Sequence, residues 1–381
     1  MSDTTPALSR SRERIRDNGQ MEYRADDRFS RQLALPGFGA DAQARLAASR
    51  VLVIGAGGLG SAVIPALAGA GVGTIGIVDD DRVELSNLPR QLMHSTRDVG
   101  RSKTQSASDT VEALNPATTV IPVGQRITAA NALPLLADYD LVVDGSDNFP
   151  TRYLVDDAAT LTGIPAVWGA VSQYSGQAGL SWAERGPTYR DLFPRPPAPG
   201  SVLSCEIGGV LPTVVATIGS LMATEAIKVL TGIGVPALGT VTTYEALSGS
   251  FRSLAYAKDP SGAAVTELID YDAFCGIAAS VTPAELAARI RDTSATDFTL
   301  LDVREPWEAE IASLPGSVLM PLASLDATSL DATKPVVVYC HLGIRSANAR
   351  EFLASQGLTV SHLAGGIDAW ARDLDPEMTR Y

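Results

Sequence analysis

A glycine-rich stretch carries the first residues suited to chemistry. Gly55, Gly57 and Gly60 form a GxGxxG pattern after the apolar run RVLVI, and Asp79 ends the next apolar run. Such a turn brings backbone N–H groups and a helix N-terminus close to a phosphate, while the acid can bind a ribose hydroxyl. The pattern alone does not say which nucleotide binds, and glycines that serve only helix–strand packing would look the same.

The polar residues that follow the turn indicate which nucleotide binds there. Arg90 and Lys103 supply two cations, and Ser86 and Asn87 add hydroxyl and amide groups. Asp147 is the last residue of the segment GSD, which directly follows the apolar run DLVVD. Two cations near phosphates suit attack on a triphosphate, where negative charge builds on the leaving group. A carboxylate such as Asp147 can hold Mg²⁺. Hydride transfer has no use for this set, so we expect an ATP site with Mg²⁺.

The segment YCHLGIRSA carries the second signal. Cys340 ends an apolar run and Arg345 opens a helical one, with four residues between them. Backbone N–H groups of such a loop form an anion-binding concavity, and the helix dipole with Arg345 favours a thiolate. Phosphatases place five residues between the two, so this loop is smaller. It resembles the loop of the rhodanese family, as do LLDVREPWEAE and LAGGIDAW, over about residues 281–376.

The rhodanese resemblance implies a persulfide on Cys340 that carries a transferable sulfur. His341 stands where basic residues are common in relatives, and a largely neutral imidazole there leaves the sulfur donor open. Asp302 and Arg304 are interpreted as a structural pair. His94 and His362 show no ligand spacing.

Apolar runs and helical patterns alternate through both halves of the chain. This alternation predicts an α/β fold: a Rossmann-like, mostly parallel sheet followed by a small α/β domain. We expect a flexible arm over residues 1–24, a nucleotide-binding domain over 25–258, a linker over 259–280 and, over 281–381, the domain that resembles the rhodanese family. A long buried helix should run from residue 209, with Pro212 inside it, and stop at Gly232. Thr282 should cap the next domain's first helix, with Glu285 at its third position.

Composition excludes several functions. The 381 residues have a net charge of −13, which disfavours nucleic acid and anionic lipid as partners. No uninterrupted apolar run of membrane-spanning length and no secretory leader are seen. The three cysteines, Cys205, Cys275 and Cys340, are too few and scattered for a disulfide framework. We therefore expect a cytoplasmic protein without membrane or nucleic-acid partners.

Seven segments together resemble one known family. RFSRQLALPGFG, GAGGLGS, DDDRVELSNLPRQ, VGRSKTQSA, DGSDNFPTRYLVDDA, WGAVSQYSGQ and SCEIGGVLP follow in order between about residues 25 and 260. They look like the MoeB/ThiF family, bacterial relatives of ubiquitin-activating enzymes. With its second domain the chain resembles the MoeBR-type fusions in an actinobacterial-like form. The resemblance implies adenylation of the C-terminal Gly-Gly carboxylate of a ubiquitin-like sulfur carrier, which then becomes a thiocarboxylate.

The resemblance also implies roles for individual residues. Nucleotide binding falls to Gly55, Gly57, Gly58, Asp79, Ser86, Asn87, Leu88, Pro89, Arg90, Lys103, Asp147 and Asn148. Arg31 corresponds to an arginine supplied to the partner subunit's ATP, which implies a homodimer. Cys205 stands at the family's cysteine and would form an acyl disulfide or thioester. Many relatives hold a zinc with two CxxC pairs, but Thr188 and Asp191 stand where the first pair would be, so we expect no structural zinc.

Two other functions are compatible with the sequence. One is a non-catalytic scaffold, and the other is a Rossmann oxidoreductase fused to a sulfurtransferase. The identity of the carrier is open, and so is the sulfane-sulfur donor, which could be a cysteine desulfurase or thiosulfate.

Overall fold

Two compact units make up the chain. The computed structural model describes residues 14–15, 21–22, 28–197, 208–275, 280–291 and 298–381. Among these, residues 14–15, 21–22, 28–194 and 208–268 belong to the first unit, and residues 195–197, 269–275, 280–291 and 298–381 belong to the second. The division falls inside the predicted 259–280 linker. Part of that segment is ordered as the short helix α11 (Tyr271–Phe274).

An eight-stranded sheet forms the centre of the first unit, in the order β10-β9-β8-β7-β6-β3-β4-β5. Its strands are β3 (Arg50–Ile54), β4 (Thr74–Val78), β5 (Thr119–Val123), β6 (Leu141–Asp144), β7 (Ala166–Ser172), β8 (Ser175–Ser181), β9 (Thr240–Glu245) and β10 (Ser250–Ala255). In this order, the neighbouring strands β7, β6, β3, β4 and β5 pair in parallel, whereas β7, β8, β9 and β10 pair antiparallel. The continuous apolar runs become central strands buried on both faces, as expected for parallel strands covered by helices. This confirms the Rossmann-like, mostly parallel sheet.

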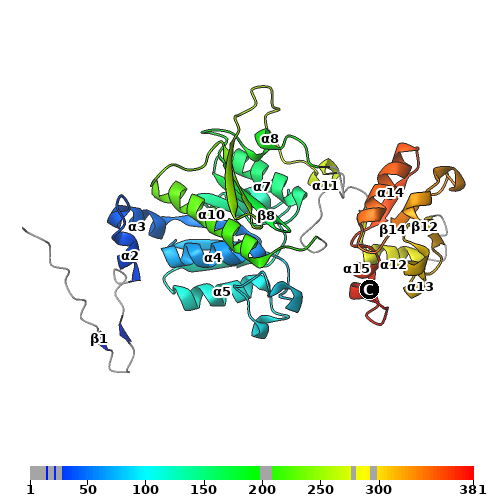
Figure 1. Cartoon of the computed structure of the whole chain (residues 1–381), viewed down its shortest axis with the longest axis horizontal. Helices are drawn as coiled ribbons and strands as arrows, with labels where there is room; N and C mark the ends of the chain where they lie inside the picture. Colours follow the sequence, from blue (N-terminus) through cyan, green and yellow to red (C-terminus); the bar gives the residue numbers. More distant parts are fainter. Residues whose placement is uncertain (1–13, 16–20, 23–27, 198–207, 276–279, 292–297) are drawn as a thin grey trace, which may run out of the picture. The chain divides into compact units, whose positions relative to one another are not determined.

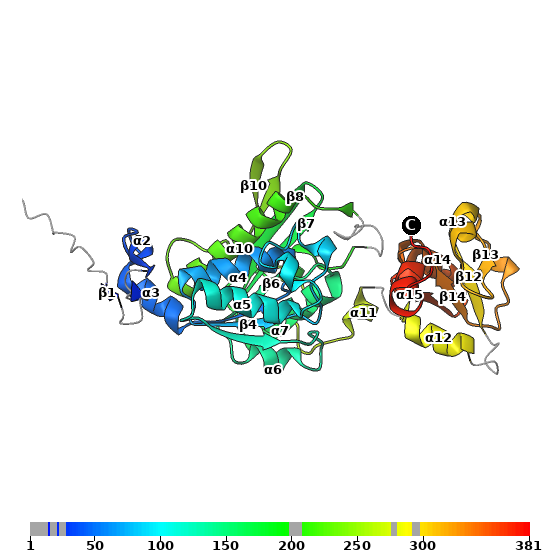
Figure 2. The ribbon, with the colours of Figure 1, turned by 90° about the horizontal axis from the view of Figure 1, so that it is seen from below.

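Helices cover both faces of this sheet. Right-handed crossovers place α4 (Gly58–Ala70) and α5 (Lys103–Leu114) on one face and α6 (Ala132–Leu136) and α7 (Phe149–Thr162) on the other (Figures 1 and 2). The long helix α10 (Pro212–Thr231) packs beside α4 (Figure 1). The short helices α2 (Ser30–Leu33), α3 (Gly39–Ala48) and α8 (Tyr189–Leu192) and the 3-10 turns η1 (Leu85–Asn87) and η2 (Thr96–Asp98) complete the unit.

Helix α10 ends as predicted, but it begins three residues later than the predicted start at residue 209, because proline is favoured at the first position of a helix. Pro212 is its first residue and Gly232, with a φ of +72°, is its C-cap. Among the described helices it is long and apolar enough to cross a membrane by length and composition, with a mean hydropathy of 1.4, although it lacks an uninterrupted apolar run. It packs against α4, β7 and β8, which is the setting of a core helix.

The segment predicted as an N-terminal arm falls mostly outside the described residues. Within it, β1 (Arg14–Ile15) and β2 (Met21–Glu22) pair antiparallel. At the other end of the unit β9 and β10 form a hairpin, which pairs from Thr240 with Ala255 to Glu245 with Ser250.

A five-stranded parallel sheet forms the second unit, in the order β11-β15-β14-β12-β13. Its strands are β11 (Ser280–Val281), β12 (Thr299–Asp302), β13 (Val318–Leu319), β14 (Val336–Tyr339) and β15 (Val360–Leu363). The helices are α12 (Pro283–Arg291), α13 (Pro306–Ile311), α14 (Ile344–Ser355) and α15 (Gly366–Leu374), with 3-10 turns η3 (Leu322–Ser324) and η4 (Ala327–Ser329). The predicted cap on α12 is confirmed: Thr282 N–H and Oγ1 each donate to Glu285 Oε2 at 2.9 Å.

Candidate functional sites

The glycine turn joins β3 to α4 at the carboxyl end of the sheet. Gly55 has a φ of +90°, a conformation that glycine adopts without strain. Gly60 sits against the turn so closely that a Cβ there would lie 2.1 Å from Gly55 O. The two outer glycines therefore permit a tight turn, and α4 directs its N-terminal N–H groups to the place where a phosphate would bind.

Asp79 is tied to the glycine turn. Its Oδ2 accepts a hydrogen bond from Ala56 N at 2.7 Å, and its Oδ1 accepts one from Asp81 N at 2.9 Å. Burial raises the pKa of Asp79, while the charge of Lys103 opposes that rise. His94 also forms a hydrogen bond with the turn, because its Nε2 lies 2.9 Å from Ala56 O. The predicted ribose-binding acid thus lies beside the turn.

The loop that follows β4 brings its polar residues to the same turn. Gly58 lies against the loop, since a Cβ on it would be 3.7 Å from Arg90 O. Arg90 Nη1 donates to Ser86 O at 3.0 Å, and Asn87 closes the η1 turn by accepting from Glu84 N at 3.2 Å. In this loop Leu88 is half-buried and Pro89 exposed.

Lys103 reaches the strand tip from the first turn of α5. Its side chain is buried, and its Nζ donates to Asp81 Oδ2 at 2.8 Å. The carboxylates of Asp79, Asp80 and Asp81 all lie within 4.8 Å of one another. The lysine therefore offsets part of a dense negative charge, and its partner Asp81 is largely exposed, so a phosphate can compete for the ammonium.

Asp147 and Asn148 follow β6, the strand next to β3. Asn148 caps α7 by accepting from Thr151 N at 2.9 Å, and the exposed carboxylate of Asp147 lies 3.5 Å from Asn148 Nδ2. A buried ion pair that no sequence motif indicated lies at the end of the same strand. Asp144 lies 3.7 Å from Arg152, which also donates to Ser146 O and Gly169 O at 2.8 Å each. Arginine at the fourth position of α7 gave no motif signal by itself.

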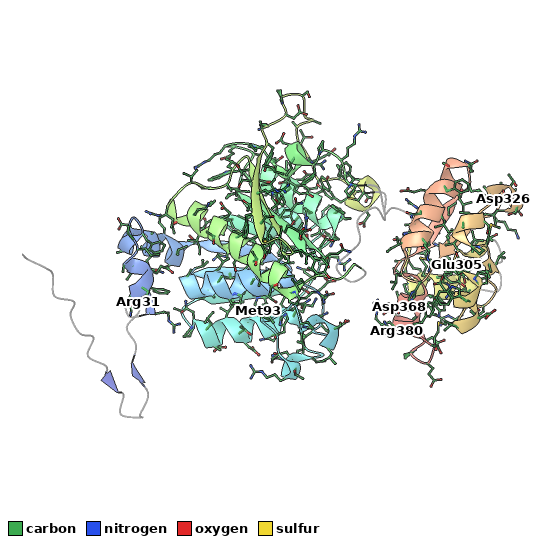
Figure 3. All side chains as sticks on the ribbon, viewed as in Figure 1. Arg31, Met93, Glu305, Asp326, Asp368 and Arg380 are labelled. Atoms are coloured by element: carbon green, nitrogen blue, oxygen red, sulfur yellow. The ribbon has the colours of Figure 1, made fainter. Side chains whose placement is uncertain are left out.

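Arg31 lies away from its own glycine turn. It is exposed on α2, and its neighbour Gln32 donates to Ala70 O at 2.9 Å, at the C-terminal end of α4. Helix α4 has 13 residues, so the two ends are separated by about 20 Å. Figure 3 shows Arg31 on α2, apart from Met93 in the loop that holds Arg90. Within one chain the structure does not bring Arg31 to the other predicted nucleotide residues.

Hydrogen bonds and aromatic packing hold the segment where relatives carry a zinc. Thr188 and Asp191 form a capping box on α8, and Asp191 Oδ1 accepts from Asp259 N at 2.8 Å. Arg190 forms a bidentate pair with Asp157 at 2.6 and 2.7 Å. Edge-to-face or tilted ring contacts join Tyr153, Trp168, Tyr189 and Phe193. These contacts fix the segment without any metal ligand being needed, while the absence of zinc stays a prediction.

Cys340 lies at the end of β14, and its loop wraps around the sulfur. Gly343, with a φ of +92°, donates its N–H to Sγ at 3.1 Å, and the hydroxyl of Ser346 lies 3.5 Å from Sγ. The loop's outer edge is held by Ile367 N, which donates to Cys340 O at 2.9 Å. Gly366 allows that close approach, because a Cβ there would lie 2.5 Å from Cys340 O. The predicted concavity therefore holds hydrogen-bond donors for a sulfur anion.

Arg345 forms an ion pair that the sequence analysis did not foresee. Its Nη1 and Nη2 donate to the two oxygens of Glu308, at 2.5 and 2.6 Å. Tyr381 O–H also donates to Glu308 at 3.1 Å, and the Tyr381 ring stacks on His341 with centroids 4.2 Å apart. Burial lowers the pKa of His341, in line with the expected neutral imidazole. The predicted Asp302–Arg304 pair is confirmed, at 2.6 Å and fully buried.

Cys205 lies outside the described residues, so its predicted role stays a prediction. The other two cysteines, Cys275 and Cys340, are both buried.

The two sites define a class of protein: a nucleotide-binding α/β domain coupled to a domain with a cysteine in an anion-binding loop. Family models give the same division. The ThiF family model matches residues 29–264, and the rhodanese-like domain model matches residues 282–373. The chain belongs to the ThiF family and carries a rhodanese-like domain.

Several named proteins are similar over most of the chain. The probable adenylyltransferase/sulfurtransferase MoeZ of Mycobacterium tuberculosis is 46% identical, covering 93% of this chain and 95% of the relative. The adenylyltransferase and sulfurtransferase MOCS3 of Bos taurus is 39% identical, covering 100% and 90%. The sulfur carrier protein adenylyltransferase of Thermus thermophilus is 50% identical, covering 66% and 97%. This chain is accordingly an adenylyltransferase and sulfurtransferase.

Solved structures support the fold of the first unit. The crystal structure of E. coli MccB with ATP aligns with a TM-score of 0.56 at 22% identity, covering 62% of this chain and 74% of that one. At this identity the likeness concerns the fold alone.

Proposed function

We propose that the first site adenylates the C-terminal carboxylate of a ubiquitin-like sulfur carrier ending in Gly-Gly, and that Cys340 supplies the sulfur. The observation that supports this most directly is the presence of both reaction sites on one chain. A glycine turn lies beside Asp79 and Lys103, and a loop of donors surrounds Cys340.

Adenylation activates a carboxylate that is otherwise unreactive. A carrier carboxylate oxygen attacks the α-phosphorus of ATP, pyrophosphate leaves, and an acyl-adenylate remains. Arg90 and Lys103 would offset the charge on the phosphates, and the N-terminus of α4 would hold one of them. Mg²⁺, when bound, would neutralise phosphate charge, and the exposed carboxylate of Asp147 suits it as an oxygen ligand.

Sulfur transfer follows at Cys340. A sulfane-sulfur donor, either a cysteine desulfurase or thiosulfate, loads this thiolate as a persulfide. The terminal sulfur of the Cys340 persulfide attacks the acyl carbon, and AMP leaves. A second thiol, which we assign to Cys205, then attacks the Cys340 sulfur and releases the carrier thiocarboxylate. The disulfide left behind is returned to two thiols by a thiol reductant, which suits a cytoplasmic location.

A homodimer completes the nucleotide site in this proposal. Arg31 stands about one helix length from its own glycine turn, so we assign it to the ATP of the partner subunit. Mixed dimers of Arg31→Ala and Lys103→Ala chains test the assignment by carrier-dependent ATP–pyrophosphate exchange. In such a dimer one of the two sites keeps both residues. Exchange that recovers on mixing two inactive variants supports Arg31 acting across subunits, whereas no recovery in confirmed mixed dimers contradicts it.

A further inference from the structure

The arginine of the sulfur-transfer loop is committed to a carboxylate. Both terminal nitrogens of Arg345 donate to Glu308, whose side chain is 4% exposed, and the hydrogen bonds from Arg345 lower the pKa of Glu308 to about 2. Glu308 is fixed further by Glu305 N at 3.0 Å and by the hydroxyl of Tyr381 at 3.1 Å. The carboxylate therefore stays ionised and aligned on the guanidinium at neutral pH.

Two other guanidiniums near the loop are also paired. Arg304 is fully buried and forms an ion pair with Asp302, in which Nη2 lies 2.6 Å from Oδ2. Its Nη1 donates a hydrogen bond to Tyr381 Oη at 2.8 Å. Arg380 donates to both oxygens of Asp368 at 2.8 and 3.0 Å, and Figure 3 shows these two side by side. Each positive charge on these groups is therefore balanced by a carboxylate in contact with it.

His341 adds no cation beside the sulfur. It directly follows Cys340, and the charges that bear on it are those of Asp368, Glu308, Arg345 and Arg304. Burial lowers its pKa below the ordinary histidine range, so the imidazole is neutral at pH 7. Its face is covered by the Tyr381 ring at 4.2 Å.

We propose that Glu308 is a specificity-determining residue: by occupying Arg345 it denies an oxyanion donor its cation, so that Cys340 takes sulfur from a persulfide rather than from thiosulfate. This inference rests on the proposed sulfur transfer through Cys340. Thiosulfate carries two negative charges, and an unpaired guanidinium would be the natural partner for its sulfonate oxygens.

The donors differ in what must leave. With thiosulfate, the Cys340 thiolate attacks the sulfane sulfur, the S–S bond breaks, and sulfite departs with two negative charges. With a persulfide R–S–S–H, the thiolate attacks the terminal sulfur and the S–S bond breaks. The proton of the terminal sulfur passes to the departing sulfur, which leaves as the neutral thiol R–S–H, and the negative charge stays on the Cys340 persulfide anion. A loop whose arginines are already balanced by carboxylates suits the second reaction.

The test compares donors on the full-length protein, with cyanide as the acceptor and intact mass as the readout for Cys340 loading. Cysteine persulfide and a persulfidated cysteine desulfurase serve as small and protein-borne persulfides. The wild type should show a higher kcat/KM with a persulfide than with thiosulfate. Glu308→Gln keeps the shape of the side chain and frees the charge of Arg345, so kcat/KM for thiosulfate should rise about tenfold, the value of one charge-assisted contact.

Controls separate this role from a structural one. Glu310→Gln removes an exposed glutamate on the same helix and should change neither donor's kinetics. The double variant Glu308→Gln/Arg345→Met should lose the rise with thiosulfate. A folded Glu308→Gln protein with unchanged or lower thiosulfate kcat/KM would overturn the proposal. So would a wild type that uses thiosulfate as well as persulfides, a result that does not depend on any variant folding. If no donor loads Cys340, the proposed sulfur transfer itself fails, and adenylation by the first site can still stand.

Discussion

Gly60→Ala should damage the nucleotide site through a single methyl group. The added Cβ would lie 2.1 Å from Gly55 O and 3.0 Å from Gly55 C, both backbone atoms of the turn. Relieving the closer contact requires the turn and α4 to separate by roughly 1 Å, a strain typical of overpacked cores that costs about 1–3 kcal/mol. The displaced atoms belong to the phosphate-binding turn, so the free energy of unfolding and the affinity for ATP should fall together.

Gly69→Ala is the matched control, because it adds the same methyl group near the other end of α4. There the Cβ would find Leu114 Cδ2 at 3.8 Å, an ordinary contact, and alanine favours the helix. We expect a higher KM for ATP in pyrophosphate exchange and a lower melting temperature for Gly60→Ala, with neither change in Gly69→Ala. Sulfur transfer from a persulfide to cyanide, catalysed by the other unit, should persist in both. If Gly60→Ala matches Gly69→Ala in ATP KM and melting temperature, the close packing of Gly60 against Gly55 does not control the nucleotide site.

Two further predictions concern stability. Burial raises the pKa of Asp156 to about 7 from the ordinary 3.8, so between these pH values the folded state holds a proton that the unfolded state has released. The stability that this protonated group contributes is therefore lost as the pH rises toward 7. In thermal unfolding, the melting temperature of the wild type relative to that of Asp156→Asn should decline over that pH range. Thr282→Ala removes the hydroxyl that accepts from Glu285 N, and should cost the second unit about 1 kcal/mol in urea unfolding. A flat pH difference for the first, or an unchanged midpoint for the second, would contradict these assignments.

Local patterns were sufficient to predict the frame of both units. The apolar runs before Gly55 and Cys340 became central parallel strands, and Gly232 marked the C-terminal end of α10, because strand burial and helix termini depend on nearby residues. The Thr282 cap likewise involves residues three apart. Motif spacing also placed Asp79 beside the glycine turn, since strand ends in a parallel sheet share one edge.

Contacts between distant segments could not be predicted in this way. Glu308 contacts Arg345, which lies 37 residues away, and Tyr381, which lies 73 residues away, and neither Glu308 nor Tyr381 belongs to the YCHLGIRSA segment of the cysteine loop. The expectation that Arg345 acts on the thiolate came from its spacing to Cys340 and missed the carboxylate that it contacts. Arg152 was missed for the same reason, because its partners belong to other strands.

The central claim is that ATP-dependent activation and the Cys340 persulfide act on one carrier. The most direct measurement is intact mass spectrometry of Gly-Gly carriers incubated with this protein, ATP, Mg²⁺ and a persulfide donor. We expect the mass gain of one oxygen replaced by one sulfur, which disappears in Cys340→Ala while carrier-dependent pyrophosphate exchange continues. A thiocarboxylate formed equally well by Cys340→Ala from the same donor would contradict the account.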